Sequence, residues 1–262
     1  MCEGPTHAIG GVAFGLGAAA AYGAATGHPT TLPVAVVCGL LGAGAAMAND
    51  LDHHNSTATN SAGAASDAIS RGVRWLSIAV FDLTATPADR ARFRGAHRGL
   101  THTGFVVPLL GAFFAGLCGR FGWPAILPTL WLVFYLAVRG LPPVQKPRVD
   151  AVQALGMAAV GTWLLPHDTS GVVIGAAVAA GVLSHTVLDG MTTAGVPFSA
   201  PFWKRRGQRW WRWWFLPRCL RFPADSETAA RVVSTLSVVA AVALFPGVFP
   251  FALHVLAAIR TH

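Results

Sequence analysis

The sequence predicts an all-α protein, a multi-pass transmembrane helical bundle of roughly six to eight membrane helices, and two observations support this fold class. First, 53% of the 262 residues are hydrophobic, only 11% are charged, and the mean hydropathy is +0.53. Water-soluble domains carry about 25% charged residues, so the chain has too few charges to cover a water-facing surface on every side. Second, the apolar residues are gathered into long runs separated by polar, arginine-rich connections. We expect one integral-membrane domain over residues 1–262.

The apolar runs define the expected helices, and several are only about 16 to 18 residues long, at the short end of what spans a hydrocarbon core. In chain order they cover residues 8–26, 32–48, 103–119, 121–138, 151–166, 171–188 and 229–259. The first run is rich in Gly and Ala, which lets helix backbones approach closely in lipid. It follows Glu3 rather than the basic segment of a cleavable signal. The last run is long enough for two short helices or one tilted span, and Pro246 and Pro250 favour a break.

The distribution of basic residues predicts which helix ends face the cytoplasm. Arginine and lysine gather in the connections 49–102, 139–150 and 189–231. If the first six helices alternate from a cytoplasmic N-terminus, all three connections lie on one side and the opposite loops keep only Arg120. Because cytoplasmic loops carry the excess of Lys and Arg, we expect a plasma (inner) membrane protein with a cytoplasmic N-terminus.

Two of these connections contain segments that we expect at the membrane surface. Residues 202–222 (FWKRRGQRWWRWWFLPRCLRF) mix Arg with Trp, as in a segment that lies on anionic headgroups. The net charge of +8 and the pI near 10.4 could also suggest a nucleic-acid-binding protein. Because the membrane topology already explains the excess of basic residues, we expect membrane lipids as partner and no nucleic acid. The insert 55–95 either carries an interfacial helix around 66–80 or is a poorly ordered linker. The scattered Cys2, Cys38, Cys118 and Cys219 lack metal-type spacing, and we interpret them as reduced or buried.

Ionisable side chains occur at the ends of the predicted helices, and the topology brings four such groups to the cytoplasmic end. They are His7 before the first helix, NDLDHH (49–54) at the end of the second, AHRGLTHT (96–103) at the start of the third and SHTVLDG (184–190) at the end of the sixth. In the last motif, His185 and Asp189 lie one turn apart on one face of a helix. A carboxylate in apolar surroundings is costly unless it is paired, so its partner is another side chain or a metal ion.

The four motifs supply a donor set suited to a divalent metal. Imidazoles and carboxylates without thiolates are typical of hydrolytic zinc, manganese or iron sites, and we predict zinc first. The predicted ligands are His7, Asp50, Asp52, His53, His97, His102, His185 and Asp189. We expect about one to three ions, and two ions roughly 3.5–4 Å apart, bridged by Asp189, Asp50 or Asp52, would activate a bound water.

Each motif also has a structural alternative. Helix capping would account for His7, for NDLDHH and for HRGLTHT, and a buried His–Asp hydrogen bond would account for His185 with Asp189. The remaining histidines fit the donor set less well, and we do not assign them to it: His28, His54, His167, His254 and His262.

Arg98 lies between two predicted ligands, where a guanidinium can hold a phosphate or carboxylate oxygen by a bidentate contact. It can equally bond the carboxylates of the site and hold them in place. Thr192 and Thr193 can offer hydroxyl groups to a substrate or a ligand, although this segment is more simply interpreted as the turn after the helix. The predicted catalytic residues are Arg98, Asp52 and Asp189.

In order and spacing, these motifs resemble the family of membrane-bound metal-dependent hydrolases typified by the bacterial inner-membrane protein YdjM. The resemblance rests on a His in the first helix, NDLDHH, HRGLTHT and LSHTVLDGMTTAGVPF, spread over about residues 7–202. It implies a multi-pass inner-membrane protein whose motif His and Asp residues bind metal. A distant similarity of the family to zinc phospholipase C implies phosphoester chemistry on a lipid or other membrane substrate. Two departures are Asn49, where the family has Pro, and the long insert 55–95.

Three functions are compatible with this pattern. The first, which we expect, is a hydrolase that cleaves a phosphoester of a lipid or small molecule at the cytoplasmic membrane face through a metal-activated water. The second is a metal or proton transporter, because ionisable groups in membrane helices often mark ion pathways; it predicts polar groups on both sides, whereas the cluster lies at one end. The third is a non-catalytic membrane scaffold or regulatory protein. No nucleophilic Ser or Cys motif or glycine-rich nucleotide loop stands out.

Overall fold

The computed structural model is an all-α bundle, as the sequence predicts, and describes residues 4–246 except 28, 94–96, 142–145 and 166–169. Within these residues the α-helices are α1 (Gly4–Thr26), α2 (Leu32–Ala48), α3 (Ala64–Thr84), α4 (Pro87–Arg90), α5 (Val106–Phe121), α6 (Trp123–Gly140), α7 (Pro147–Leu164), α8 (Ser170–Gly190) and α9 (Glu227–Leu244). Short 3-10 helices occur at η1 (Asn49–Asp52), η2 (Leu100–His102) and η3 (Arg218–Leu220). Strand-like pairing among the described residues is confined to isolated bridges.

In the described part of the chain, five helical segments are long and apolar enough to cross a membrane. They are α1, Leu32–Asp52 (α2 with η1), α6, Gly171–Gly190 of α8, and α9. α5 is apolar but has only 16 residues, and α7 carries Arg148 and Asp150 in its first turn. These seven helices correspond to the seven predicted runs. α9 ends at Leu244, and the part of the last run from residue 247 onward, which includes Pro250, lies outside the described residues.

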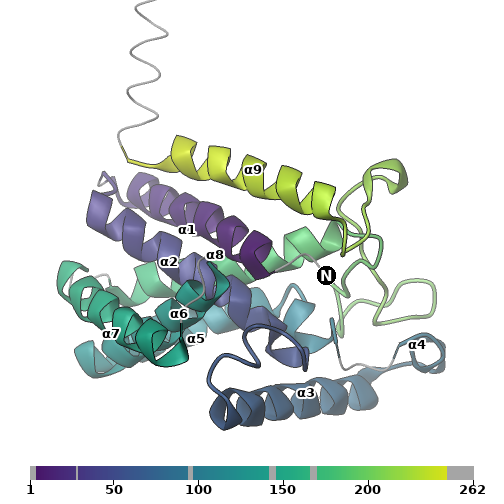
Figure 1. Cartoon of the computed structure of the whole chain (residues 1–262). Helices are drawn as coiled ribbons and strands as arrows, with labels where there is room; N and C mark the ends of the chain where they lie inside the picture. Colours follow the sequence, from purple (N-terminus) through teal and green to yellow (C-terminus); the bar gives the residue numbers. More distant parts are fainter. Residues whose placement is uncertain (1–3, 28, 94–96, 142–145, 166–169, 247–262) are drawn as a thin grey trace, which may run out of the picture.

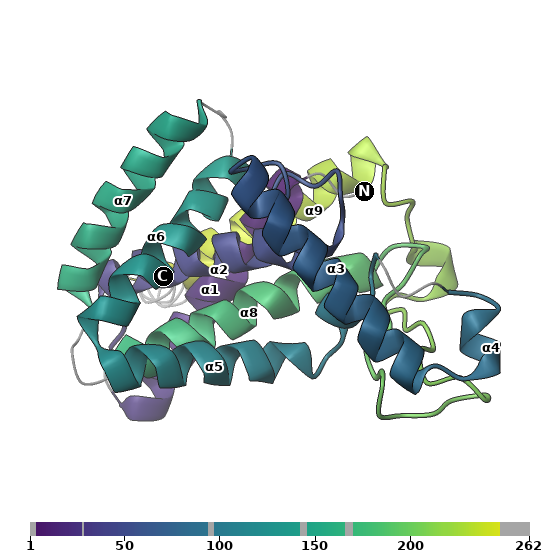
Figure 2. The same ribbon diagram turned by 90° about the horizontal axis from the view of Figure 1, so that it is seen from below.

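Close backbone contacts hold the centre of the bundle together. α1, α2 and α8 lie side by side, α9 packs on α1, and α5, α6 and α7 lie along the other flank (Figures 1 and 2). A Cβ atom added at Gly11 would overlap the backbone of Gly42 in α2, and one at Gly44 would overlap the carbonyl of Val133 in α6. Small residues at these crossings let the helices approach at backbone distance, which favours association in lipid.

The N-terminal end of α1 meets the C-terminal ends of α2, α6 and α8 at one end of the bundle. Met47 near the end of α2 lies against Gly4 of α1 and Gly140 of α6. Arg139 Nη1, at the end of α6, donates to Asp150 Oδ2 at the start of α7, at 2.8 Å. The arginine-rich connections and the ionisable motifs therefore lie at the same end of the bundle.

The insert 55–95 contains α3, which corresponds to the helix expected around 66–80. α3 lies across this end of the bundle (Figure 2), with a polar inner face that includes buried Ser70 and Ser77. Ser77 Oγ accepts from the backbone N–H of Leu100 in η2, at 2.9 Å. The outer face is apolar and exposed, with Trp75 and Leu83 at 71% and 86%, as expected for an amphipathic helix that turns its apolar side outward.

Candidate metal centre

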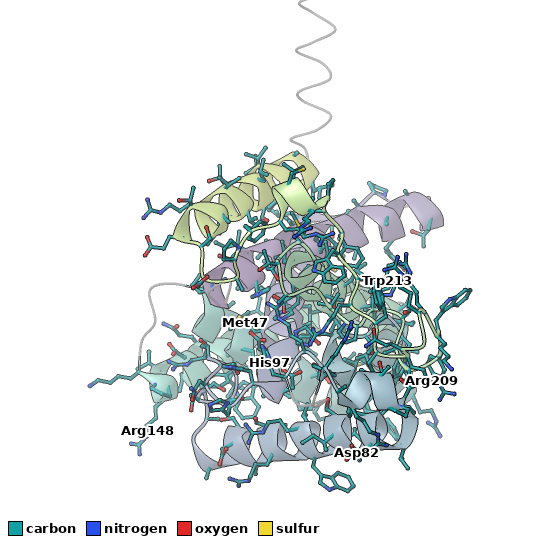
Figure 3. All side chains as sticks on the ribbon, turned by 90° about the vertical axis from the view of Figure 1, so that its right-hand side faces the viewer. Met47, Asp82, His97, Arg148, Arg209 and Trp213 are labelled. Carbon is teal, nitrogen blue, oxygen red and sulfur yellow. The ribbon has the colours of Figure 1, made fainter. Side chains whose placement is uncertain are left out.

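Seven of the eight predicted ligands converge at the end of the bundle where α1, α2 and α8 meet. His7 lies at the end of the first turn of α1, and Asp50 and Asp52 lie on η1, which tightens the end of α2. His102 ends η2, and His185 and Asp189 occupy the last turns of α8. Figure 3 looks toward this end of the molecule, with His97 near the middle, Trp213 and Arg209 on one side and Arg148 on the other.

Asp189 is the hub of the cluster. Its Oδ2 lies 3.1 Å from His102 Nε2 and 3.8 Å from His185 Nε2. Its Oδ1 lies 3.6 Å from His7 Nε2 and accepts a hydrogen bond from Arg98 Nη2 at 2.8 Å. All five side chains are buried, so this carboxylate sits among four nitrogen groups away from bulk water.

The spacing of the ring nitrogens suits a bound cation. Ligand atoms held about 2.0–2.2 Å from a tetrahedral zinc ion lie roughly 3.3–3.6 Å from one another. His102 Nε2 and His185 Nε2 are 3.2 Å apart, which with Asp189 Oδ2 completes a triangle with sides of 3.1, 3.2 and 3.8 Å. His7, Asp50 and His185 form a second such group, in which Asp50 Oδ1 is 3.5 Å from His185 Nε2.

Asp52 organises the outer part of the cluster. It accepts a hydrogen bond from Thr101 Oγ1 at 2.7 Å and lies 3.3 Å from His97 Nδ1 and 3.4 Å from His102 Nδ1. Asp50, Asp52 and His97 form a third group that could hold an ion. The side chain of His97 is 33% exposed, so this group lies at the edge of the cluster that reaches solvent.

Several buried ring nitrogens have no hydrogen-bond partner among the described residues. They include Nδ1 of His7, His53 and His185. The ring of His53 is 4.5 Å from that of His97, but His53 does not join any of the three donor groups. Its role as a ligand therefore remains a prediction. Of the histidines left out of the predicted donor set, His54 is exposed, and His28, His167, His254 and His262 lie outside the described residues.

The electrostatics favour a positive charge between the carboxylates of Asp52 and Asp189. Burial alone would lower the pKa of His102, but the charges and hydrogen bonds of Asp52 and Asp189 outweigh it and raise that pKa to about 9. Burial, followed by the electrostatic effect of the neighbouring His97, lowers the pKa of His53. Asp52 and Asp189 therefore stabilise positive charge at His102, which can be a proton on the imidazole or, when the imidazole is neutral, a divalent metal ion bound to it. Among the described cysteines, Cys38 and Cys118 are buried, Cys219 is exposed, and none belongs to the three donor groups; Cys2 lies outside the described residues.

Arg98 adopts a strained backbone conformation that directs it into the cluster. Its φ of 51° lies in the left-handed region, which is uncommon for a side chain other than Gly, Asn or Asp and tends to mark functional positions. Besides bonding Asp189, its Nη1 donates to Thr192 Oγ1 at 2.9 Å. Of the two uses that the sequence allows for Arg98, the structure contains the contact with a site carboxylate. Thr192 is part of this network, whereas Thr193 is exposed.

The hydrogen bond from Thr101 to Asp52 was not predicted from the sequence, which offers helix capping as the structural alternative for the motif HRGLTHT. The neighbouring Thr103 bonds the carbonyl of Leu100 rather than a cluster residue, and the first turn of α5 has no side-chain cap. A hydroxyl one residue before a predicted histidine ligand was the available signal, but its direction depends on the turn of η2.

Comparison with known proteins identifies the family of the chain. No curated protein and no solved structure matches it. A model of the YdjM inner membrane protein family matches residues 1–139, more than half of the 262 residues. The matched part contains His7, Asp50, Asp52, His97 and His102, while His185 and Asp189 lie beyond it. With its apolar helices, the chain is a multi-pass inner-membrane protein and belongs to the YdjM inner membrane protein family.

Proposed function

We propose that this protein is a membrane-bound, metal-dependent hydrolase that cleaves a phosphoester at the cytoplasmic membrane face. The observation that carries the proposal is the buried triangle of His102 Nε2, His185 Nε2 and Asp189 Oδ2, with sides close to the ligand spacing of a tetrahedral zinc ion. Helix capping does not account for it, because the three side chains come from η2 and α8 and point at one another.

The donor groups indicate which residues would hold the metal. His102, His185 and Asp189 would hold one ion, and His7 with Asp50 or Asp50 with Asp52 and His97 would hold others. When bound, such ions lower the pKa of water and neutralise charge on a phosphoryl group.

The protein's own side chains would position the substrate and move protons. Arg98 places a guanidinium at the cluster while neutralising Asp189, and a guanidinium fork matches the oxygens of a phosphate. Asp52 orients His97 through Nδ1, leaving the partly exposed ring to exchange a proton with a substrate at the edge of the site. His97 is thus suited either to this role or to holding an outer ion.

The placement of the cluster supports a substrate at the membrane. Three of the helices that carry it, α1, α2 and α8, are apolar enough to span a bilayer, and the cluster lies at their ends. The basic connections lie at the same end, which favours the cytoplasmic side. A phospholipid headgroup or a soluble phosphoester would have access to a site at the ends of these helices.

Metal analysis of the purified full-length protein in detergent tests the proposal. We expect at least one equivalent of zinc, manganese or iron in the native protein, and loss of metal in His185→Ala and Asp189→Ala. His54→Ala is the matched control, because His54 is an exposed histidine beside the cluster, and it should keep the native metal content. Near-zero metal in the native protein would remove the basis of the proposal.

A turnover screen then tests hydrolysis. The native protein should release phosphate or a phosphorylated headgroup from a phospholipid or phosphomonoester, and His185→Ala should not. Flux of metal ions into proteoliposomes without any such turnover would instead support the alternative that the protein is a transporter.

A further inference from the structure

The insert 55–95 and the Trp/Arg segment 202–222 form one structural unit beside the metal cluster. Asp89 of α4 is buried and accepts hydrogen bonds from the backbone N–H groups of Arg209 and Trp210, each at 3.1 Å. Gln208 Nε2 donates to the carbonyl of Ala88 at 3.1 Å. These contacts join segments about 120 residues apart in sequence and fix the start of the tryptophan-rich stretch.

Aromatic side chains build the walls of a cavity in this unit. Trp210 is buried against Phe81, with ring centroids 5.2 Å apart, and its Nε1 donates to Thr84 Oγ1 of α3 at 3.0 Å. The cavity has a volume of about 120 Å³ and is lined by Phe93, Trp210, Trp211, Trp214, Arg92 and Arg212, among others. It is larger than one water molecule requires. Asp89 also borders it, but its carboxylate already accepts the backbone donors of this unit.

Arg212 is a partly buried cation that has no carboxylate within ion-pair distance among the described residues. Its guanidinium lies over the ring of Phe93, 4.4 Å from the centroid, and its Nη1 donates to the carbonyl of Gly195 at 3.0 Å. Other arginines of the described chain, such as Arg98 and Arg139, pair with aspartates when they are buried. Burial and then the charge of Arg98 lower the pKa of Arg212 to about 10, so it remains protonated at neutral pH.

The same turn holds Arg212 and Arg98 near each other. Arg98 donates to Thr192 at the start of the turn, Arg212 donates to Gly195 at its end, and the turn is closed by Gly195 N–H donating to the carbonyl of Thr192 at 3.3 Å. Two guanidinium groups anchored on one four-residue turn repel each other. An anion with several oxygens would relieve this repulsion and use their remaining donors.

We propose that Arg212 and Arg98 together bind the phosphate group of the substrate, and that the aromatic cavity receives the part of the substrate next to that phosphate. This inference rests on the proposed function for the identity of the ligand as a phosphoester. It assigns a role to both the insert and the tryptophan-rich segment: they carry the substrate pocket, and the bundle carries the metal ligands.

The test measures binding rather than turnover. Inorganic phosphate and short-chain phosphatidic acid in detergent micelles are titrated calorimetrically into the full-length protein, both chelator-treated and zinc-loaded. Arg212→Gln should raise the Kd for the phosphate-bearing probe that binds by about tenfold or more, because it removes a charged hydrogen-bonding group. The Kd of Arg212→Lys should lie between those of the native protein and Arg212→Gln, since lysine keeps the charge but lacks the planar guanidinium fork. Arg218→Gln is the matched control, an exposed arginine of the same segment, and should leave binding unchanged.

The outcomes separate the source of the ligand and the two proposals. Tighter binding of phosphatidic acid than of phosphate indicates a lipid headgroup, and equal binding indicates a soluble phosphoester; both support the pocket if Arg212→Gln weakens them. Binding by neither probe, or equal Kd values for Arg212→Gln and Arg218→Gln, overturns the inference. If the protein holds no metal and hydrolyses none of the substrates, but still binds the probe in an Arg212-dependent way, the proposed hydrolase function is wrong and the proposed anion site is supported.

Discussion

Replacing Thr101 by valine tests whether metal binding by the proposed site depends on the hydroxyl that bonds Asp52. Thr101 Oγ1 donates to Asp52 Oδ2 at 2.7 Å and lies 2.9 Å from His102 Nδ1. Valine keeps the branched shape of the side chain but removes this donor. The carboxylate that orients both His97 and His102 then loses its shortest hydrogen bond.

The size of the effect follows from the charge on the acceptor. A hydrogen bond to a charged group contributes about 1.5–3 kcal/mol, and about 1.4 kcal/mol corresponds to a tenfold change in Kd. Thr101→Val should therefore weaken zinc binding about tenfold to a hundredfold, the range typical of residues that orient metal ligands. Replacing a predicted ligand such as His102 by alanine should weaken zinc binding further.

Competition with a chromogenic zinc chelator, in detergent, measures this Kd. Thr103→Val is the matched control, because Thr103 lies two residues away, is buried, and its hydroxyl bonds only the carbonyl of Leu100 among the described residues. We expect its zinc affinity to stay close to that of the native protein. The reasoning is refuted if Thr101→Val binds zinc as tightly as the native protein while His102→Ala does not, or if the two threonine variants lose affinity equally.

Three further predictions concern the bundle and its surface. Gly44→Leu should prevent recovery of monodisperse protein in detergent, because its Cβ would overlap the backbone of α6. Gly116→Ala should behave as the native protein, because a Cβ atom at Gly116 would meet no other atom within 4 Å. Asp150→Asn should lower the free energy of unfolding by about 1.5–3 kcal/mol, since it replaces the charged hydrogen-bond partner of a largely buried arginine of α6 by a neutral one. Glu227→Gln, in an exposed pair, should lower it by less than about 1 kcal/mol, and equal shifts in thermal unfolding would contradict this. Trp75, exposed on α3, should be quenched by brominated lipids, so Trp75→Phe should reduce the quenched fraction of the fluorescence; no reduction would place the outer face of α3 away from lipid.

Much of the fold could be predicted from local sequence. The run 32–48 coincides with α2, and the run 8–26 falls within α1, because long apolar stretches in a chain this poor in charge form membrane helices. The run 151–166 was less informative, since α7 begins four residues earlier, with Arg148 and Asp150 in its first turn. Helix ends that carry charge are set by contacts such as Arg139 with Asp150, which hydropathy does not report.

The site was predictable as a group of residues but not as a geometry. The motifs predict His7, His102, His185 and Asp189 as ligands because ionisable groups are out of place at the ends of apolar helices, and the structure brings these four side chains together. Arg212 was not identified, since one arginine among the eight basic residues of 189–231 has no distinguishing local pattern. The position of Arg212 depends on its contact with Gly195 and on its contact with Phe93, which is more than 100 residues away in sequence.

By itself, the sequence determined which segments are apolar helices, which ends carry imidazoles and carboxylates, and the family to which the chain belongs. Hydropathy and the one-turn spacing of His185 and Asp189 are local properties, so they are readable without a fold. Only the tertiary structure decided which ring nitrogens share a carboxylate oxygen, that Arg98 bonds Asp189, and that two distant segments form one aromatic cavity. The physical reason is that these distances depend on how helices are rotated against one another. Backbone contacts such as Gly11 with Gly42 set the rotation of the helices. The left-handed conformation of Arg98 sets the direction of its side chain.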